Sequence, residues 1–161
     1  MGVPADLSVL EHLKERFASN YVGHHQLCGD DTFVVKPEGL LELAKYLKYQ
    51  ERYDMLMDAT AVDYKHRTPR FEMVYHFYSI VMNKRLRVKV PVDEFQAEVD
   101  SLAGFWKSAD WYEREIWDMF GIRFLGHPNL KRILMYEGFE GYPLRKDYPV
   151  NKRQPLIGPL N

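Results

Sequence analysis

The sequence predicts an α+β fold in which helices cover one face of a mostly antiparallel sheet. The chain has 161 residues, of which 46% are hydrophobic and 28% charged, as expected for one globular domain with an extension. Segments with apolar residues at helical spacing alternate with short β-rich segments. The predicted order is helix, two strands, helix, three strands and two helices, which is typical of helices layered on an antiparallel sheet.

The first half of the chain is predicted to contain two helices and a hairpin. The first helix has apolar residues at helical spacing and follows typical helix-start residues: Pro4, Asp6 and Ser8 before Leu7, Leu10, Leu13 and Phe17. Residues 20–27 and 32–36 are predicted strands, joined by the Gly-Asp-Asp turn at 29–31. Pro37 suits the start of a second helix. The buried face of that helix is expected to comprise Leu40, Leu43, Ala44 and Leu47.

The middle of the chain is predicted to form three strands and a third helix. Residues 55–64 and 71–82 are predicted strands, and apolar residues on both faces of 71–82 indicate a central position. After a turn at 83–84, cations and aliphatic residues alternate over 85–90, so one face of that strand should be buried. Residues 93–102 are predicted to form a helix, whose buried stripe is Phe95, Val99 and Leu102.

The fourth predicted helix carries a dense aromatic surface, which indicates a buried anchor. Asp110 is expected to be its N-cap, with Glu113 completing a capping-box-like pair. Gly121 is expected to end the helix in a left-handed conformation. One apolar stripe is predicted from Tyr112, Ile116 and Phe120. A charge ladder on another face is predicted from Asp110, Arg114 and Asp118.

Two blocks of sequence stand out from this helix onward. The first reads Glu113-Arg114-Glu115-x-x-Asp118-Met119-Phe120-Gly121-Ile122-x-Phe124, then Gly126-His127-Pro128-x-Leu130-x-Arg132-Ile133-Leu134. The second reads Gly141-Tyr142-Pro143-Leu144-Arg145-Lys146-Asp147-Tyr148-Pro149. Together they resemble the signature of the 30 kDa, or C, subunit family of respiratory NADH-quinone oxidoreductase (complex I). The family usually has Gly-His-Pro-Leu-Arg-Lys-Asp-Phe-Pro in the second block, so Tyr142 is a departure.

The resemblance implies a non-catalytic subunit of the peripheral arm of a proton-pumping NADH:quinone oxidoreductase, on the cytoplasmic side of the membrane. It implies contacts with the D subunit of complex I, near the quinone module, and with neighbours such as the B and I subunits. It implies no cofactor on this chain, since the FMN and iron–sulfur clusters belong to other subunits. The expected interface residues are the matching signature positions: Glu113, Arg114, Glu115, Asp118, Phe120, Gly121, His127, Pro128, Arg132, Pro143, Arg145, Lys146 and Asp147.

We expect three segments: an α+β domain at 1–106, the signature helix and following turn at 107–134, and an extended partner-docking tail at 135–161. The tail combines repeated Gly and Pro with large side chains, so it is expected to be ordered along a partner. Arg145 is expected to contact a partner carboxylate bidentately. Residues 93–120 carry 2 basic and 8 acidic groups, whereas 121–161 carry 7 and 3, which favours docking surfaces of opposite sign.

Composition argues against several other classes of protein. Cys28 is the only cysteine, so an intrachain disulfide or a thiolate-ligated cluster is excluded. We expect it to be a small buried strand residue in a reducing compartment. No basic stripe typical of nucleic-acid binding dominates the chain. The longest uncharged strand-like run, residues 73–83, is much shorter than the ~20 residues of a membrane-spanning helix.

Two other functions are considered. The first alternative, which the resemblance also implies, is the equivalent subunit of a related membrane-bound hydrogenase or of a ferredoxin or other quinone oxidoreductase complex. A stand-alone hydrolase would use the carboxylates of Glu113, Glu115 and Asp118. Residues 115 and 118 are neighbours on a helix, 113 faces elsewhere and Arg114 offers a counter-charge, so we favour a structural ion-pair network.

Three histidine sites have simple structural interpretations. His24 and His25 are adjacent in a strand and point to opposite faces, so they are not expected to hold one metal ion. His76 is expected to be a hydrogen-bonded core residue. His127, in a Gly-His-Pro turn, is expected either to set the turn geometry or to contact a partner.

Overall fold

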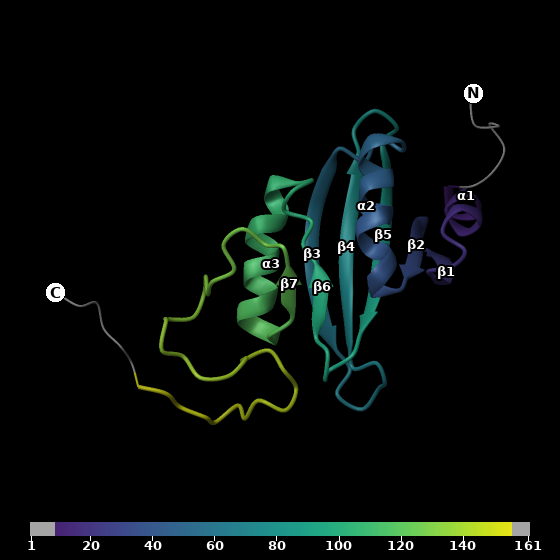
Figure 1. Cartoon of the computed structure of the whole chain (residues 1–161). Helices are drawn as coiled ribbons and strands as arrows, with labels where there is room; N and C mark the ends of the chain where they lie inside the picture. The colour runs from purple at the N-terminus through teal and green to yellow at the C-terminus, as the bar shows by residue number, and fades with distance from the viewer. Residues whose placement is uncertain (1–8, 156–161) are drawn as a thin grey trace.

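The computed structural model describes residues 9–155 and confirms the α+β class (Figure 1). In chain order its elements are α1 (Val9–Arg16), β1 (Tyr21–Leu27), β2 (Asp30–Val35), the 3-10 helix η1 (Pro37–Gly39), α2 (Leu40–Tyr49), β3 (Met55–Asp63), β4 (Phe71–Ser79), β5 (Lys84–Val92), β6 (Glu98–Asp100), α3 (Lys107–Phe120) and β7 (Arg123–Leu125). The predicted helix-start residues Pro4, Asp6 and Ser8, and also Leu7, lie outside the described residues.

The main sheet has the strand order β1-β2-β5-β4-β3. All neighbouring strands are antiparallel except β2 and β5, which run parallel. β4 is an interior strand, as predicted, and its core side chains are at most 1% exposed: Phe71, Met73, Tyr75 and Phe77. It ends at Ser79, three residues earlier than predicted, because Ile80 and Val81 enter a solvent-exposed turn.

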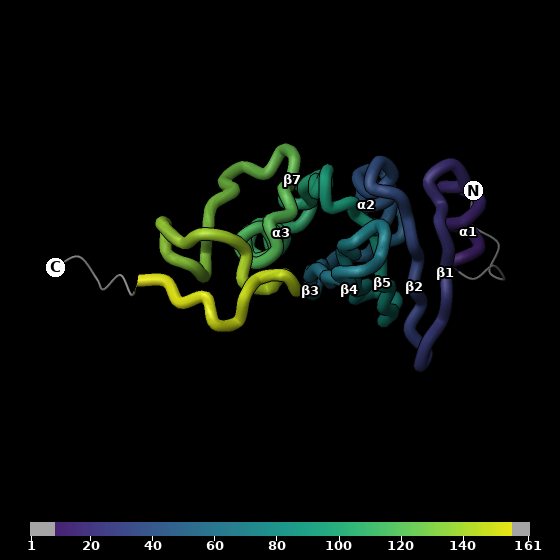
Figure 2. The backbone as a smooth tube through the Cα atoms, turned by 90° about the horizontal axis from the view of Figure 1, so that it is seen from below, coloured from purple at the N-terminus to yellow at the C-terminus, as the bar shows by residue number. Residues whose placement is uncertain are grey.

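Helices α2 and α3 lie on the same side of this sheet (Figure 2). The buried residues of α2 are the four predicted from its spacing, Leu40, Leu43, Ala44 and Leu47. In α1, Leu10 and Leu13 are buried in the same core. No helix within residues 9–155 is long and apolar enough to cross a membrane.

The predicted hairpin is present, but its turn lies one residue earlier than expected. Cys28 and Gly29 form it with φ values of 53° and 85°, and Asp30 already pairs with Leu27. The expectation that Cys28 is buried in a strand is therefore wrong, since its side chain is exposed in the turn. A two-residue hairpin turn needs positive φ values, and this requirement overrides the apolar character of the thiol.

The predicted helix over residues 93–102 is also wrong. Phe95 is 92% exposed, while Val99 and Leu102 are buried. Glu98–Asp100 form strand β6, which pairs in parallel with β7. Three apolar residues at mixed spacing fit a helix or a short strand equally well, and here the decision comes from β7, a partner that lies beyond α3 in the chain.

Helix α3 begins at Lys107, so the expected capping role of Asp110 is wrong. Trp106 occupies the N-cap position and is buried, and Asp110 lies in the first turn. Three side chains at the start of α3 donate hydrogen bonds to carbonyls in and just before the edge strand β3: Trp106 to Tyr53, Ser108 to Leu56 and Tyr112 to Met57. These bonds cover one edge of the sheet and orient α3 along it. Gly121 ends α3 with φ 74°, as predicted.

Candidate functional site

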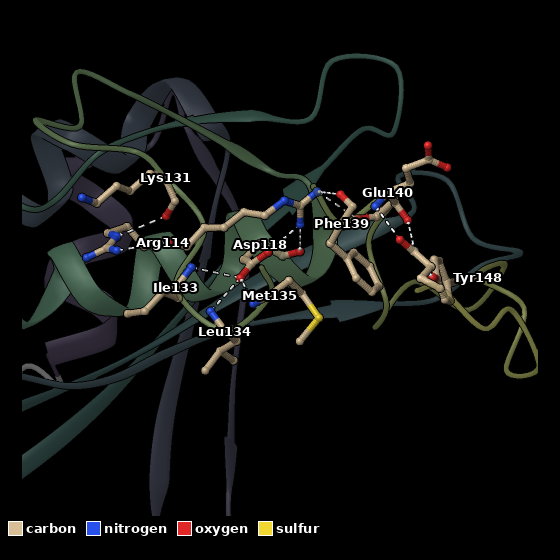
Figure 3. A network of polar contacts seen from close by, with 12 residues as sticks. Arg114, Asp118, Lys131, Ile133, Leu134, Met135, Phe139, Glu140 and Tyr148 are labelled. Carbon is tan, nitrogen blue, oxygen red and sulfur yellow. Dashed lines mark hydrogen bonds and ion pairs between the residues drawn. The ribbon is translucent and has the colours of Figure 1, made fainter. Parts of the chain in front are cut away.

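Asp118 on α3 holds the segment that follows β7. Its side chain is fully buried, and Oδ2 accepts hydrogen bonds from three consecutive backbone N–H groups, of Ile133, Leu134 and Met135, at 2.8 to 3.0 Å (Figure 3). Burial alone would raise the pKa of Asp118, but these bonds and Arg132 outweigh it and lower the pKa below its ordinary value. Asp118 is thus an ionised anchor for residues 133–135.

Arg132 is the counter-charge of Asp118 and extends the network into the tail. Its Nη1 donates to Asp118 Oδ1 at 2.5 Å. Its Nη2 donates to the carbonyl oxygens of Phe139 and Gly141 at 2.9 and 3.2 Å (Figure 3). The guanidinium therefore joins α3 to two points of the tail by charge-assisted hydrogen bonds.

Arg114 holds the other end of the same loop. Its guanidinium donates to the carbonyl oxygens of Lys131 and Arg132, both at 3.2 Å (Figure 3). The guanidinium also lies over the Trp111 ring. The predicted charge ladder along α3 is therefore wrong, because Arg114 and Asp118 both turn toward the loop. Loop carbonyls and N–H groups have no strand partners here, and these two charged side chains provide the missing partners.

Glu113 points in the opposite direction, into the core. Oε1 accepts the N–H of Leu102 and Oε2 accepts the hydroxyl of Ser101, both at 2.6 Å. The side chain has no exposed surface, and this burial raises the pKa of Glu113 to about 7. The hydroxyl of Tyr75 is also buried nearby and has no hydrogen-bond partner in the described structure. Glu113 thus fastens α3 to the segment after β6.

His127 lies between Glu113 and Asp110 with its side chain fully buried. Its Nδ1 accepts the N–H of Asn129 at 3.0 Å, so in the neutral imidazole Nε2 carries the hydrogen. Nε2 lies 3.2 Å from the carbonyl oxygen of Asp110, 3.1 Å from its Oδ1 and 3.9 Å from Glu113 Oε2. This geometry supports the turn-forming interpretation of His127.

The second signature block packs against the C-terminal end of α3. Leu144 donates its N–H to the carbonyl of Met119, and Arg145 Nε donates to the carbonyl of Phe120. The Tyr142 ring lies against Gly121, where an added Cβ would come within 2.5 Å of it. Gly121 is therefore required both for its positive φ and for the approach of Tyr142.

Arg70 joins the tail to the sheet. It makes a two-bond pair with Asp63 at 2.8 Å and single contacts with Glu94 and Asp147 at 3.0 Å. The hydrogen bond from Arg70 and those from the backbone N–H groups of Lys146 and Lys65 lower the pKa of Asp63, although burial opposes them. The tail thus has contacts within its own chain that the sequence did not indicate.

Further along the tail, the side-chain amide of Gln154 closes a loop. It accepts the N–H of Glu140 and donates to the carbonyl of the same residue, at 2.9 and 2.7 Å. It also contacts the hydroxyl of Tyr148, whose ring stacks on Phe139 (Figure 3). Residues 139–154 are therefore folded back on themselves next to α3.

The structure separates the three carboxylates considered for hydrolysis. Glu113 is buried and accepts the N–H of Leu102, whereas Asp118 accepts N–H groups of the loop at residues 133–135. Glu115 is exposed. Pro128 is exposed and Pro143 half-buried. Among residues 9–155 no group of three His, Cys, Asp or Glu side chains is placed to hold a metal ion. The arrangement organises backbone segments and presents no catalytic constellation.

Sequence reasoning did not find the partners of these residues. Asp63, Arg70, Glu94 and Ser101 lie at strand ends or in loops, where single charged or hydroxyl residues carry no periodic signal. His76 was expected in the core, but it lies half-buried on the face of β4 opposite the helices, across from Arg87. Burial, and then Arg87, lower its pKa.

Comparison with known proteins identifies the signature. The family described as respiratory-chain NADH dehydrogenase, 30 kDa subunit, matches residues 33–154. A relative from Citrifermentans bemidjiense, named as the C subunit of NADH-quinone oxidoreductase, is 49% identical over 92% of this chain and 94% of its own. The chain belongs to the 30 kDa (C) subunit family of respiratory NADH dehydrogenase.

Two solved structures show how the 30 kDa family fold is shared. The trypsin-resistant fragment of Nqo5 is 30% identical with a TM-score of 0.67, and the match covers 74% of this chain and 97% of the fragment. A chain of the membrane-bound sulfane sulfur reductase, an archaeal respiratory membrane complex, is 23% identical with a TM-score of 0.74. That match covers 89% of this chain and 85% of the other, and it is a likeness of fold alone.

Proposed function

We propose that this chain is a non-catalytic structural subunit of the peripheral arm of a proton-pumping NADH:quinone oxidoreductase. We propose that it packs against the D subunit near the quinone module, with the B and I subunits as further neighbours, on the cytoplasmic side of the membrane. The proposal rests on what the signature residues bind in the structure. Arg114, Asp118 and Arg132 bind backbone groups of residues 131–141, so these three side chains order a loop surface and are not themselves free for acid–base chemistry.

Three observations favour a supporting role within a larger enzyme. The relatives carry the name of a subunit of this oxidoreductase. Glu113 is buried and Asp118 is paired with Arg132, which suits structural roles for these two carboxylates, and we place electron transfer with its FMN and iron–sulfur clusters on other subunits. Membrane attachment would come from the complex, since residues 9–155 contain no helix suited to span a bilayer.

We further propose that the tail, residues 135–161, docks on the D subunit, while residues 1–106 form a domain that folds without it. The Nqo5 fragment supports this division, because its name describes a trypsin-resistant piece and it matches this fold. The contacts of Arg145 and Asp147 with Phe120 and Arg70 would hold the tail near its docking position. This leaves Leu144 and Val150, which are 52% and 104% exposed, to face the partner.

A second candidate function is that of an equivalent structural subunit in a different respiratory complex. The fold likeness to a chain of an archaeal respiratory membrane complex supports an equivalent subunit in a hydrogenase-like or ferredoxin-dependent complex. The 49% identity to a relative named for NADH-quinone oxidoreductase favours the quinone enzyme.

The test is affinity purification of the full chain from its native host, followed by mass spectrometry and NADH:quinone activity. We expect the B, D and I subunits to co-purify with NADH-oxidising activity. A version truncated after Leu134 should keep a cooperative unfolding transition but lose these subunits. Recovery of hydrogenase subunits would support the second candidate, and recovery of the chain alone with its own hydrolytic turnover would refute both.

A further inference from the structure

A groove lies beside the signature helix, α3, and some of the residues that line it also take part in the contacts described above. It has a volume of about 520 Å³ and lies between α3 and the loop that follows β7. Its lining comprises Trp117, Leu130, Lys131, Arg132, Met135 and Glu137. Trp117, Leu130 and Met135 are half-buried against the main core, so they form an apolar floor fixed to the domain. A volume of this size accommodates a large side chain.

The walls of the groove are held in place by α3. Arg114 bonds the carbonyls of residues 131 and 132, and Asp118 bonds the N–H groups of residues 133–135 (Figure 3). Five hydrogen bonds from α3 side chains therefore fix five consecutive loop residues, 131–135, that lie outside any helix or strand. A site that is already ordered loses little conformational entropy when a ligand binds.

The rim of the groove carries uncompensated positive charge. Arg132 is paired with Asp118, but Lys131 is exposed and forms no ion pair within residues 9–155. Arg114 does not line the groove but holds the loop that does, and its guanidinium donates to carbonyl oxygens and pairs with no carboxylate within residues 9–155. Glu137 is the acidic residue of the lining. The lining and the two α3 residues that hold it, Arg114 and Asp118, together carry three cations and two acids. This net positive charge favours a partner segment that carries carboxylates.

Large apolar side chains extend the surface beside the groove. Leu134, between two lining residues, is 58% exposed, and Trp111 is 60% exposed. Trp111, Arg114 and Asp118 follow at spacings of three and four residues, so they share one face of α3 with the bound loop. Exposed Trp and Leu next to Arg and a Met-lined groove have the composition of a protein interface core.

We infer that this groove receives a large apolar side chain from a neighbouring subunit, flanked in that subunit by aspartate or glutamate residues that pair with Lys131 and Arg114. The inference rests on the proposed function and adds a second docking surface to that of the tail. An apolar anchor in a preformed pocket with a charged rim has the form of an interface hot spot.

The test uses the full chain with an affinity tag, in a host from which the wild-type chain recovers the D subunit and its neighbours. Lys131→Glu reverses the rim charge, and Leu134→Ser removes exposed apolar surface. The matched control is Lys45→Glu, the same charge reversal at an exposed position on α2. We expect each groove variant to recover about tenfold less complex, because like charges across an interface and lost apolar burial each weaken binding by about this factor.

A second measurement identifies the occupant. A photo-crosslinking amino acid at position 131 of the assembled complex should label a peptide that contains a large apolar residue and an aspartate or glutamate. Normal assembly of both groove variants, or labelling of a basic or wholly polar peptide, would overturn the inference while leaving the proposed function intact. Failure of the wild-type chain to recover oxidoreductase subunits would instead refute the proposed function. Circular dichroism of each variant confirms that the fold is unchanged.

Discussion

Replacement of Glu113 by glutamine should make the protein more stable at pH 8. Burial raises the pKa of Glu113 from 4.5 to about 7 in the folded state. Between these two values the folded chain binds more protons than the unfolded chain, so this residue's contribution to stability falls as the pH rises. This difference in pKa corresponds to about 3 kcal/mol of folding stability. The protein loses that stability as the pH rises from 4.5 to about 7, and does not regain it at higher pH.

Glutamine fits the same hydrogen bonds without the charge. Its oxygen can accept the N–H of Leu102, and its amide can donate to Ser101 Oγ, which also accepts the N–H of Ala103. We therefore expect Glu113→Gln to match the wild type near pH 4.5 and to be up to about 3 kcal/mol more stable at pH 8. Most substitutions of buried polar residues lower the free energy of unfolding, so an increase would directly support the predicted cost of the buried charge.

The assay is urea unfolding followed by tryptophan fluorescence from pH 4.5 to 8. The control is Glu115→Gln, which removes an exposed carboxylate from the same helix and should leave the pH dependence unchanged. A variant that is less stable than the wild type at pH 8, with an unaltered pH slope, would show that the Glu113 carboxylate is stabilising. In that case the reasoning from burial would be refuted.

Three further predictions concern the anchors of the signature helix. Asp118→Asn should lower the free energy of unfolding by about 3 kcal/mol, because Arg132 and three N–H groups lose an ionised partner; urea titration measures this. Gly121→Ala should cost more than the about 1 to 2 kcal/mol of a left-handed alanine, because its Cβ would meet Tyr142, and adding Tyr142→Ala should recover the excess in a double-mutant cycle. Arg70→Lys should speed hydrogen exchange of the Lys146 amide about tenfold or more, because lysine cannot hold Asp63 through two parallel bonds.

Each of these predictions has a clear contrary result. A loss below about 1 kcal/mol for Asp118→Asn would mean that the loop keeps its conformation without the buried charge. Additive costs in the Gly121 and Tyr142 cycle would show that the ring moves freely away from the new methyl group. Unchanged exchange at Lys146 in Arg70→Lys, with exchange at the exposed Lys131 as the reference, would mean that Arg70 does not hold the tail.

The sequence alone was sufficient to predict features that depend on the residue pattern of a single segment. The stripe of α2 comprises the four predicted residues, because a 3.6-residue period allows only one buried face. The alternation over 85–90 placed the aliphatic residues of β5 in the core and its cations on the open face. Gly121 ends α3 because glycine, which has no Cβ, adopts the left-handed conformation at the lowest cost. The two signature blocks likewise led to the correct family.

Tertiary structure decided the features that depend on partners distant in the sequence. Residues 98–100 became a strand because β7 pairs with them after a helix has intervened, and no local period reports such a partner. Glu113 has a capping-box spacing from Asp110, yet its carboxylate binds Ser101 and Leu102, since packing on β3 turns that face of α3 inward. Likewise Arg70 and Asp147 are separated by 77 positions, and only the folded chain brings these opposite charges within hydrogen-bond distance.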